Sequence, residues 1–146
     1  MRRIFCLDLG PWPDLALEAQ QLRHAVFVQE QHITLPEITD AADTTALHVL
    51  ARDPQRRAVG TGRLVNASPG VGKVEFLAVS ASVRGQGVGR VMLTALTAGA
   101  RERGMHAVML FAQHNALQFY LNEGFKTSGP VFEAVGRPHQ EMHLNL

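Results

Sequence analysis

A glycine-rich run flanked by two arginines is the stretch of this sequence best suited to bind a ligand. Residues 84–90 read Arg-Gly-Gln-Gly-Val-Gly-Arg, an apolar run at 76–79 precedes them, and an apolar-periodic stretch follows. Where a strand leads through a glycine turn into a helix, the first helical N–H groups have no intrahelical partner and carry partial positive charge. Glycines also let the backbone approach phosphate oxygens closely. The run therefore predicts a site for the diphosphate of a large cofactor, with Arg84 and Arg90 adding positive charge.

Two other phosphate loops do not fit this run. A Walker loop needs Lys-Ser/Thr after its glycines, where this chain has Arg90 and Val91. A dinucleotide fingerprint needs a third glycine, which would fall at Arg90 or Met92, and an acidic residue about 20 residues further on. The region 105–108 offers no such acid. The pattern that remains is Arg-x-x-Gly-x-Gly over 84–89, and a glycine turn before an ordinary helix is the simpler alternative.

A second pattern downstream gives the first one a context. The pattern at 84–89 is similar to the Arg/Gln-x-x-Gly-x-Gly/Ala signature with which the GNAT superfamily of N-acetyltransferases holds the pyrophosphate of acetyl-coenzyme A. Residues 115–125 read Asn-Ala-x-x-Phe-Tyr-x-x-x-Gly-Phe and resemble that family's second signature, with the gap between Asn and Ala shortened. The segments 26–31, 60–63 and 138–139 resemble the ElaA-like group of bacterial members.

The resemblance implies an α/β fold, the GNAT fold, in which helices flank a mixed, mostly antiparallel central sheet. The pattern of the chain agrees, because its segments follow the order βα–βββ–αβαβ. Asp14 is expected to cap the first helix. With 146 residues, 46% of them apolar, the chain suits one core, so we expect a single domain spanning 1–146. The predicted strands are 3–9, 46–52, 57–65, 71–79, 107–111, 125–127, 131–135 and 140–144, the predicted helical stretches are 15–26, 88–99 and 116–122, and 34–44 is predicted to be an irregular loop.

Acetyl transfer from a thioester to an amine makes three chemical demands. The carbonyl must be polarised, the amine must lose a proton although an ammonium of the lysine type has a pKa of about 10.4, and the leaving thiolate must be stabilised or protonated. The family meets the first demand with a backbone N–H on a strand that splays from its neighbour, which the resemblance places at Val79. The residues that the resemblance assigns to acetyl-CoA are Leu77, Ala78, Val79, Arg84, Gly85, Gln86, Gly87, Val88, Gly89, Arg90, Asn115 and Phe119.

Two residues are candidates for proton transfer. The resemblance places the hydroxyl of Tyr120 near the cofactor sulfur as a general acid, and a core aromatic residue is the alternative interpretation. Side chains alternate along a strand, so Glu75 is expected to share one side with Leu77 and Val79 and to face the amine as its base. A surface or ion-paired glutamate is equally compatible with the sequence. His48 and the acceptor-side candidate His114 are other possible bases, since histidine titrates near neutral pH.

The acceptor is the least defined part of the prediction. Arg63 could bind a carboxylate in bidentate fashion or be a solvated charge on a strand. The acceptor is expected to be a small-molecule or peptide amine, and the sequence does not identify it. The candidates for contact with it, chosen by their similarity to the ElaA-like pattern, are Arg23, Phe27, Gln31, Arg63 and His139. His114, at the end of a predicted strand just before Asn115, is a further candidate.

Composition excludes several other classes of function. A net charge of +1 creates no field that would attract nucleic acid or a membrane surface, and the lone cysteine Cys6 suits a reducing cytoplasm. We expect no metal site, because His139 and His143 lie four residues, or roughly 13 Å, apart on a predicted strand. A homodimer is expected only by analogy with the fold. The alternative to an enzyme is a sensor or interaction module that binds acyl-CoA without turnover.

Overall fold

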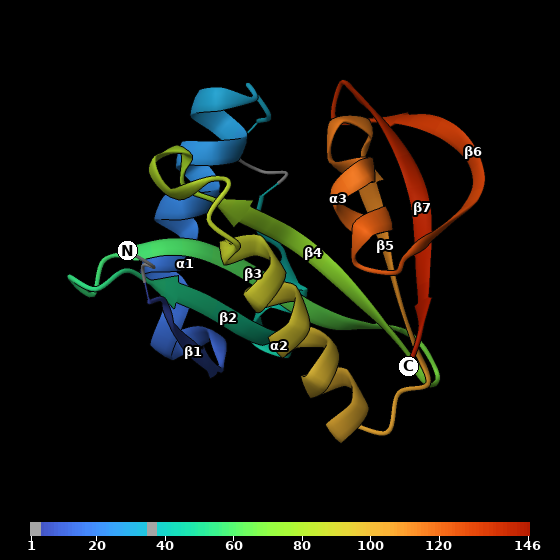
Figure 1. The fold of residues 1–146 in the computed structure, drawn as a ribbon, viewed down its shortest axis with the longest axis horizontal. Coiled ribbons are helices and arrows are strands. Elements are labelled where there is room, and N and C mark those ends of the chain that lie inside the picture. The colour runs from blue at the N-terminus through green and yellow to red at the C-terminus, as the bar shows by residue number, and fades with distance from the viewer. Residues whose placement is uncertain (1–3, 35–37) are drawn as a thin grey trace.

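The fold is built on one sheet whose strands follow the order β1-β2-β3-β4-β5-β7-β6 (Figure 1). The computed structural model describes residues 4–34 and 38–146. Every neighbouring pair in this sheet is antiparallel except β4 and β5, which are parallel. The prediction of a mixed, mostly antiparallel sheet is therefore confirmed. The strands are β1 (Cys6–Gly10), β2 (Leu47–Arg52), β3 (Ala58–Ser68), β4 (Val71–Val79), β5 (Ala107–Gln113), β6 (Lys126–Ala134) and β7 (Arg137–Asn145).

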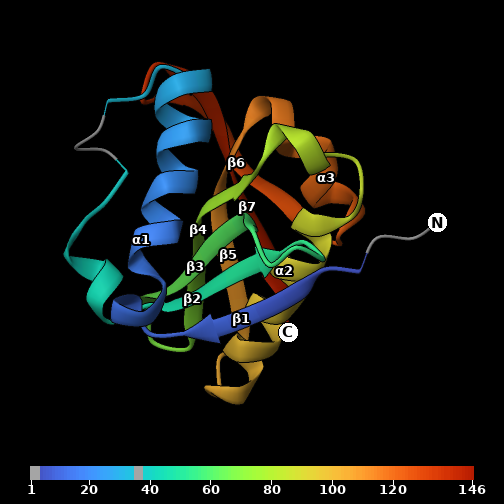
Figure 2. The same cartoon turned by 90° about the vertical axis from the view of Figure 1, so that its left-hand side faces the viewer.

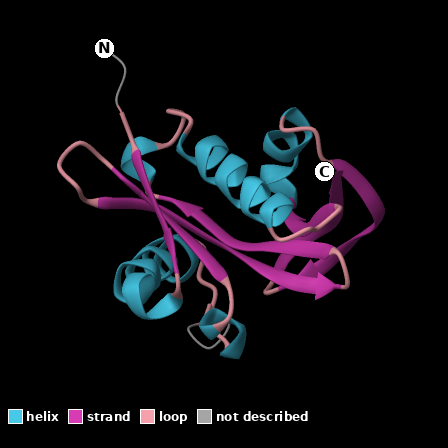
Figure 3. Ribbon diagram, turned by 90° about the horizontal axis from the view of Figure 1, so that it is seen from below, coloured by secondary structure: helices cyan, strands magenta, loops and turns pink. Residues whose placement is uncertain are grey.

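Helices cover both faces of the sheet (Figure 3). Helix α1 (Trp12–Arg23) continues directly into the π-helix η1 (His24–Glu30), and Figure 2 shows the two as one continuous coil. This coil packs on one face, and α2 (Val88–Glu102) and α3 (Leu117–Asn122) lie on the other. No helix within the described residues is long and apolar enough to cross a bilayer. Short 3-10 turns lie at Ala41–Thr44 (η3), Ala81–Val83 (η4) and His114–Ala116 (η5).

Three boundary predictions need correction. Pro11, whose side chain makes no capping hydrogen bond, occupies the N-cap of α1, so Asp14 lies in the first turn instead. The two predicted strands near the C-terminus form the single strand β6, because pairing with β7 resumes after an irregular register between Ser128 and Phe132. The predicted loop at 34–44 contains the turn η3, and its residues 35–37, like residue 3 of the first predicted strand, lie outside the described residues.

Strands β4 and β5 separate beyond their first residues. Pairing between them is limited to Val71–Lys73 and Ala107–Met109, after which the two strands diverge (Figure 1). Residues 74–79 therefore have no strand partner on the β5 side, which leaves backbone N–H and C=O groups available there. The expectation that this strand splays from its neighbour is confirmed.

A β-bulge interrupts β4 at Phe76. Arg63 of β3 pairs with Glu75 and Thr61 pairs with Ala78, so two residues of β4 oppose one residue of β3. The φ of Phe76 is 52°, in the left-handed region that an aromatic residue rarely adopts. Packing around this residue must therefore hold the backbone in a conformation that its own preference disfavours.

The bulge changes which side of the sheet Glu75 faces. Leu77 and Val79 pack against the core beneath α2, whereas Phe76 packs with apolar residues of η1 on the opposite face. The carboxylate of Glu75 hydrogen-bonds the Arg63 guanidinium, which lies over the ring of Phe76 and hence on that same opposite face. The expectation that Glu75 shares a side with Leu77 and Val79 is wrong, because strict alternation fails where a bulge adds one residue.

Candidate functional site

The glycine run forms an open cradle at the start of α2. Gly87 occupies the N-cap of that helix with a φ of 85°, and Gly85 has a φ of 79°. A Cβ at either position would meet no atom within 4 Å, so the positive φ, not crowding, is what requires glycine there. Among the residues that the structure describes, none accepts a hydrogen bond from the N–H groups of 85–90. The cradle therefore presents unpaired donors to solvent, as a diphosphate site requires.

The two arginines beside the cradle are held differently. Nε of Arg84 donates to the Val79 carbonyl at 3.1 Å, and its Nη2 donates to Glu30 at 2.9 Å. Arg84 thus ties the end of β4 to η1. Arg90 is 72% exposed and lies 3.6 Å from Glu123, so its charge remains accessible at the helix start.

A cavity of about 680 Å³ opens where β4 and β5 separate. It is lined by β4, η1, the end of β5, α3 and the start of β7. The predicted residues that line it are Phe27, Gln31, Glu75, Leu77, Ala78, Val79, Arg84, Asn115, Tyr120 and His139. The predicted residues outside its lining are Arg23, Arg63, His114, Phe119 and the cradle residues 85–90.

Tyr120 reaches the cavity from α3. Its ring packs edge-to-face against Phe119 and Phe125, with centroids 5.0 and 5.7 Å away. Phe119 itself lies over the cradle, where a Cβ added at Gly89 would come within 3.3 Å of its ring. Burial raises the pKa of the Tyr120 hydroxyl, so this group stays protonated at neutral pH. Tyr120 thus lines the cavity in its protonated form.

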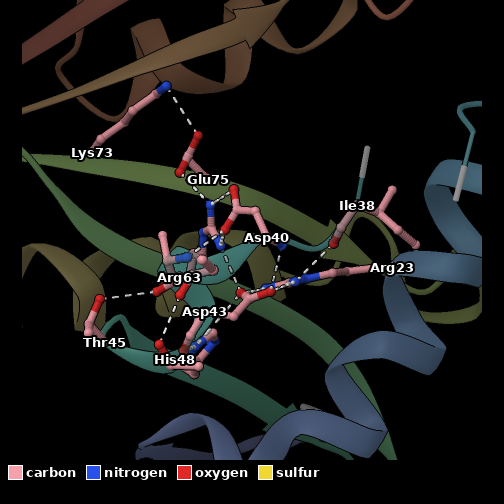
Figure 4. Close-up of polar contacts among 12 residues, drawn as sticks. Arg23, Ile38, Asp40, Asp43, Thr45, His48, Arg63, Lys73 and Glu75 are labelled. Atoms are coloured by element: carbon pink, nitrogen blue, oxygen red, sulfur yellow. Dashed lines mark hydrogen bonds and ion pairs between the residues drawn. The ribbon is translucent and has the colours of Figure 1, made fainter. Parts of the chain in front are cut away.

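Two arginines expected to contact the acceptor lie instead in a buried ionic cluster (Figure 4). Arg23 makes a bidentate pair with Asp43, both N–O distances being 3.0 Å, and also donates to the Ile38 carbonyl at 2.9 Å. Arg63 donates to Asp43 at 2.8 Å and to Asp40 at 2.6 and 2.9 Å. Arg23 and Arg63 are 0% and 1% exposed, so both guanidiniums are occupied by carboxylates of the chain.

The cluster reaches the cavity through Glu75. One carboxylate oxygen of Glu75 accepts from Arg63 at 2.8 Å, and the other lies 3.1 Å from Nζ of Lys73 (Figure 4). Two guanidiniums lie over the ring of Phe76, that of Arg23 at 4.4 Å and that of Arg63 at 4.6 Å from the ring centroid. These cation–π contacts and the ion pair hold the bulge of β4 in place.

Sequence reasoning missed the acidic half of this cluster. Asp40 and Asp43 form a capping box around the turn η3, a spacing of three that is visible in the sequence. Burial alone would raise the pKa of Asp43, but hydrogen bonds from Arg23 and Arg63 lower it overall. Asp43 therefore remains a carboxylate in a nearly dry environment.

The two histidines considered as alternative bases lie outside the cavity lining. Nε2 of His48 donates to the Asp43 carbonyl at 2.8 Å, and its ring packs on Trp12 with a centroid distance of 4.7 Å. Burial lowers the pKa of His48, which keeps this ring neutral inside the cluster. His114 lies exposed in η5. Among the described residues, no group of three or more His, Cys, Asp or Glu side chains is placed to hold a metal ion.

Two glutamines connect the end of η1 to β5. Nε2 of Gln113, at the end of β5, donates to Oε1 of Gln31 at 2.8 Å. The bridge ties the end of η1 to the end of β5, and both glutamines line the cavity.

Comparison with known proteins agrees with the geometry. Residues 16–146 match the family model of the acetyltransferase (GNAT) domain. The chain therefore belongs to the GNAT acetyltransferase family, and the resemblance seen in the two signatures is confirmed.

Solved structures extend the agreement to nearly the full chain. A Lactobacillus plantarum protein assigned to the N-acetyltransferases is 26% identical, with a TM-score of 0.89, and the match covers 97% of this chain and 98% of that one. Escherichia coli ElaA is 26% identical, with a TM-score of 0.83 and coverage of 96% and 99%. An acyl-CoA N-acyltransferase from Pseudomonas aeruginosa is 27% identical, with a TM-score of 0.80 and coverage of 96% and 99%.

Proposed function

We propose that this protein transfers an acetyl group from acetyl-CoA to a primary amine by direct attack in a ternary complex. The observation that carries the proposal is the arrangement of three features in and beside one cavity. The cradle offers unpaired N–H donors, β4 offers free backbone groups, and Tyr120 offers a proton donor. Bound acetyl-CoA would supply the activated thioester.

Each part of the site has a separate role in this reaction. The N–H groups of the cradle bind the diphosphate, and the unpaired edge of β4 at Leu77–Val79 binds the pantetheine arm and polarises the carbonyl. Asn115 contacts that arm. Tyr120 gives its proton to the departing sulfur. The acceptor enters from the face of η1, where Phe27, Gln31 and Glu75 line the cavity.

Binding is tested by thermal unfolding with and without acetyl-CoA. A ligand at 100 times its Kd stabilises the folded state by about 2.7 kcal/mol. Gly87→Leu should abolish this shift. Gly104→Leu is the matched control, because Gly104 ends the same helix with a φ of 74° and open space around it, yet lies at the far end from the cradle. Both substitutions should cost about 1–2 kcal/mol of intrinsic stability, so only the ligand response distinguishes them.

Turnover is tested by mass spectrometry on a panel of primary amines: phenethylamine, spermidine, free amino acids and a lysine peptide. Formation of an acetylated amine with release of free thiol supports the enzyme. Binding of acetyl-CoA without transfer to any amine would favour the alternative, a non-catalytic acyl-CoA sensor of the same fold. If the protein neither binds acetyl-CoA nor transfers its acetyl group, both the enzyme and the sensor proposals are refuted. A cytoplasmic location, a single domain over 1–146 and a homodimer remain part of the proposal.

A further inference from the structure

His139 lies in the cavity wall, and one of its ring nitrogens already makes a hydrogen bond. It lies on β7 and is 7% exposed, and its Nδ1 is 2.8 Å from the Arg137 carbonyl oxygen. A carbonyl only accepts hydrogen bonds, so Nδ1 must carry the proton. In the neutral ring the lone pair then resides on Nε2, and Nε2 is the basic nitrogen.

That basic nitrogen belongs to a side chain that lines the cavity. Nε2 of His139 has no partner among the described residues, yet it is absent from the buried polar atoms that lack one, so it retains accessible surface. The imidazole stacks on Phe132 at a centroid distance of 5.9 Å and an interplanar angle of 26°. Together the stack and the Nδ1 hydrogen bond fix the direction in which Nε2 points.

His139 and Tyr120 approach the cavity from opposite faces of the sheet. His139 pairs with Gln113, whose side chain reaches Gln31 of η1, so this pair lies on the η1 face. Met142, three residues further along β7, packs with Tyr120 in the core on the α3 face. A base on the first face and an acid on the second leave the gap between β4 and β5 for the reacting atoms.

We propose that His139 is the general base of the transfer, a role that rests on the function proposed above. The amine nitrogen attacks the acyl carbon through its lone pair, and the new C–N bond forms as the C–S bond breaks. The proton lost by nitrogen goes to Nε2 of His139, and the sulfur takes the proton of the Tyr120 hydroxyl. Proton exchange with solvent then restores the neutral imidazole and the phenol, so protons and charge balance.

Glu75 is the competing base, and its surroundings differ. Both of its carboxylate oxygens make ion pairs, one with Arg63 and one with Lys73, whereas Nε2 of His139 has no such partner within residues 4–34 and 38–146. The charged groups that share the cavity, and so affect any titration within it, are Glu30, Lys73, Glu75, Arg84 and Arg137, with Glu141 on the same face of β7 and ion-paired to His143.

The first test measures the tautomer and needs no turnover. Nitrogen-15 NMR of the full chain, with and without bound coenzyme A, should show His139 with its proton on Nδ1 at alkaline pH. His139→Asn assigns the signal, and it also keeps an amide donor for the Arg137 carbonyl. A ring protonated on Nε2 in both states would overturn the proposal, because that nitrogen could not accept a proton.

The second test is chemical rescue. His139→Ala should lower kcat roughly 10²–10⁴-fold and change the shape of the pH profile of kcat, and added imidazole should restore part of the rate. His139→Asn should lose a similar factor while keeping the acetyl-CoA thermal shift, which shows that the fold and cofactor site are intact. His143→Asn, the same change on the same strand but outside the cavity lining, should retain activity.

The outcomes separate the two proposals. If wild-type protein acetylates an amine and His139→Ala does so at a similar rate, His139 is not the base and the transferase function stands. The same holds if the loss is large but imidazole has no effect and the pH profile keeps its shape. If wild-type protein transfers to no amine, the transferase function fails and the role of His139 fails with it.

Discussion

Removing the charge of Asp43 should destabilise the fold far more than removing a surface carboxylate. Asp43→Asn keeps the shape of the side chain but leaves Arg23, at 0% exposure, with only the Ile38 carbonyl as a full partner. Breaking a buried ion pair by removing one partner costs about 3–5 kcal/mol. With an unfolding entropy of roughly 2.1 cal/mol/K per residue over 146 residues, this corresponds to a fall in Tm of about 10–16 °C.

The matched control is Asp8→Ala. Asp8 is 51% exposed and pairs with Arg52 at 2.6 Å, and Arg52 keeps Glu18 as a second partner. Because such exposed pairs contribute about 0–1 kcal/mol, the control should stay close to wild type. Urea and thermal denaturation followed by circular dichroism give both free energies. A loss below 1 kcal/mol for Asp43→Asn, indistinguishable from Asp8→Ala, would refute the view that the cluster is held by charge.

The dependence on pH gives a second check with a definite sign. The pKa of Asp43 is lowered from its ordinary value of 3.8, since hydrogen bonds from Arg23 and Arg63 outweigh the effect of burial. Its contribution to stability is therefore fully present above the unfolded pKa and is lost as pH falls through the folded pKa. The wild type should lose stability below about pH 4, and Asp43→Asn should show a shallower decline. If the stability of both proteins fell equally steeply with pH, the lowered pKa of Asp43 would be contradicted.

Two further predictions address the site and the sheet. Tyr120→Phe should lower kcat roughly 10²–10⁴-fold. Stability should change little, because burial, and no hydrogen bond with a described residue, accounts for the raised pKa of the Tyr120 hydroxyl. Unchanged steady-state turnover across the pH range would exclude the acid role. Gly62→Ala should cost about 1–3 kcal/mol, because the new Cβ would come within 2.8 Å of Leu77, whereas Gly10→Ala, with open space around it, should stay within about 0.5 kcal/mol in the same denaturation assay.

The sequence predicted those parts of the site that depend on local pattern. The cradle at 84–90 and the helix after it follow from glycine spacing and apolar periodicity, and both lie where they were expected. Tyr120 lines the cavity from the short helix that the local Asn115–Phe125 pattern predicted. Whether these residues bind acetyl-CoA and transfer protons stays a prediction.

What could not be predicted depends on contacts between distant segments. Arg23 and Arg63 have the same appearance in the sequence whether they bind an acceptor or pair with Asp43, which is 20 residues from each of them. No pattern in the sequence around Phe76 indicates the bulge, because guanidiniums from two other elements stabilise the strained φ of this residue. The face of Glu75 was misassigned for that reason.

The buried ionic cluster and the cavity are therefore connected through direct contacts. Arg63 contacts the ring of Phe76 and the carboxylate of Glu75, so the same guanidinium that neutralises Asp43 also fixes the bulge of β4. The bulge lies immediately before residues 77–79, whose edge has no strand partner on the β5 side. An isolated strand edge of this kind would be prone to pair with its neighbour, since unpaired backbone groups are costly when buried. Two buried guanidiniums over the ring of Phe76 hold the bulge that precedes this edge, so the charge of the cluster has a structural role beneath the site.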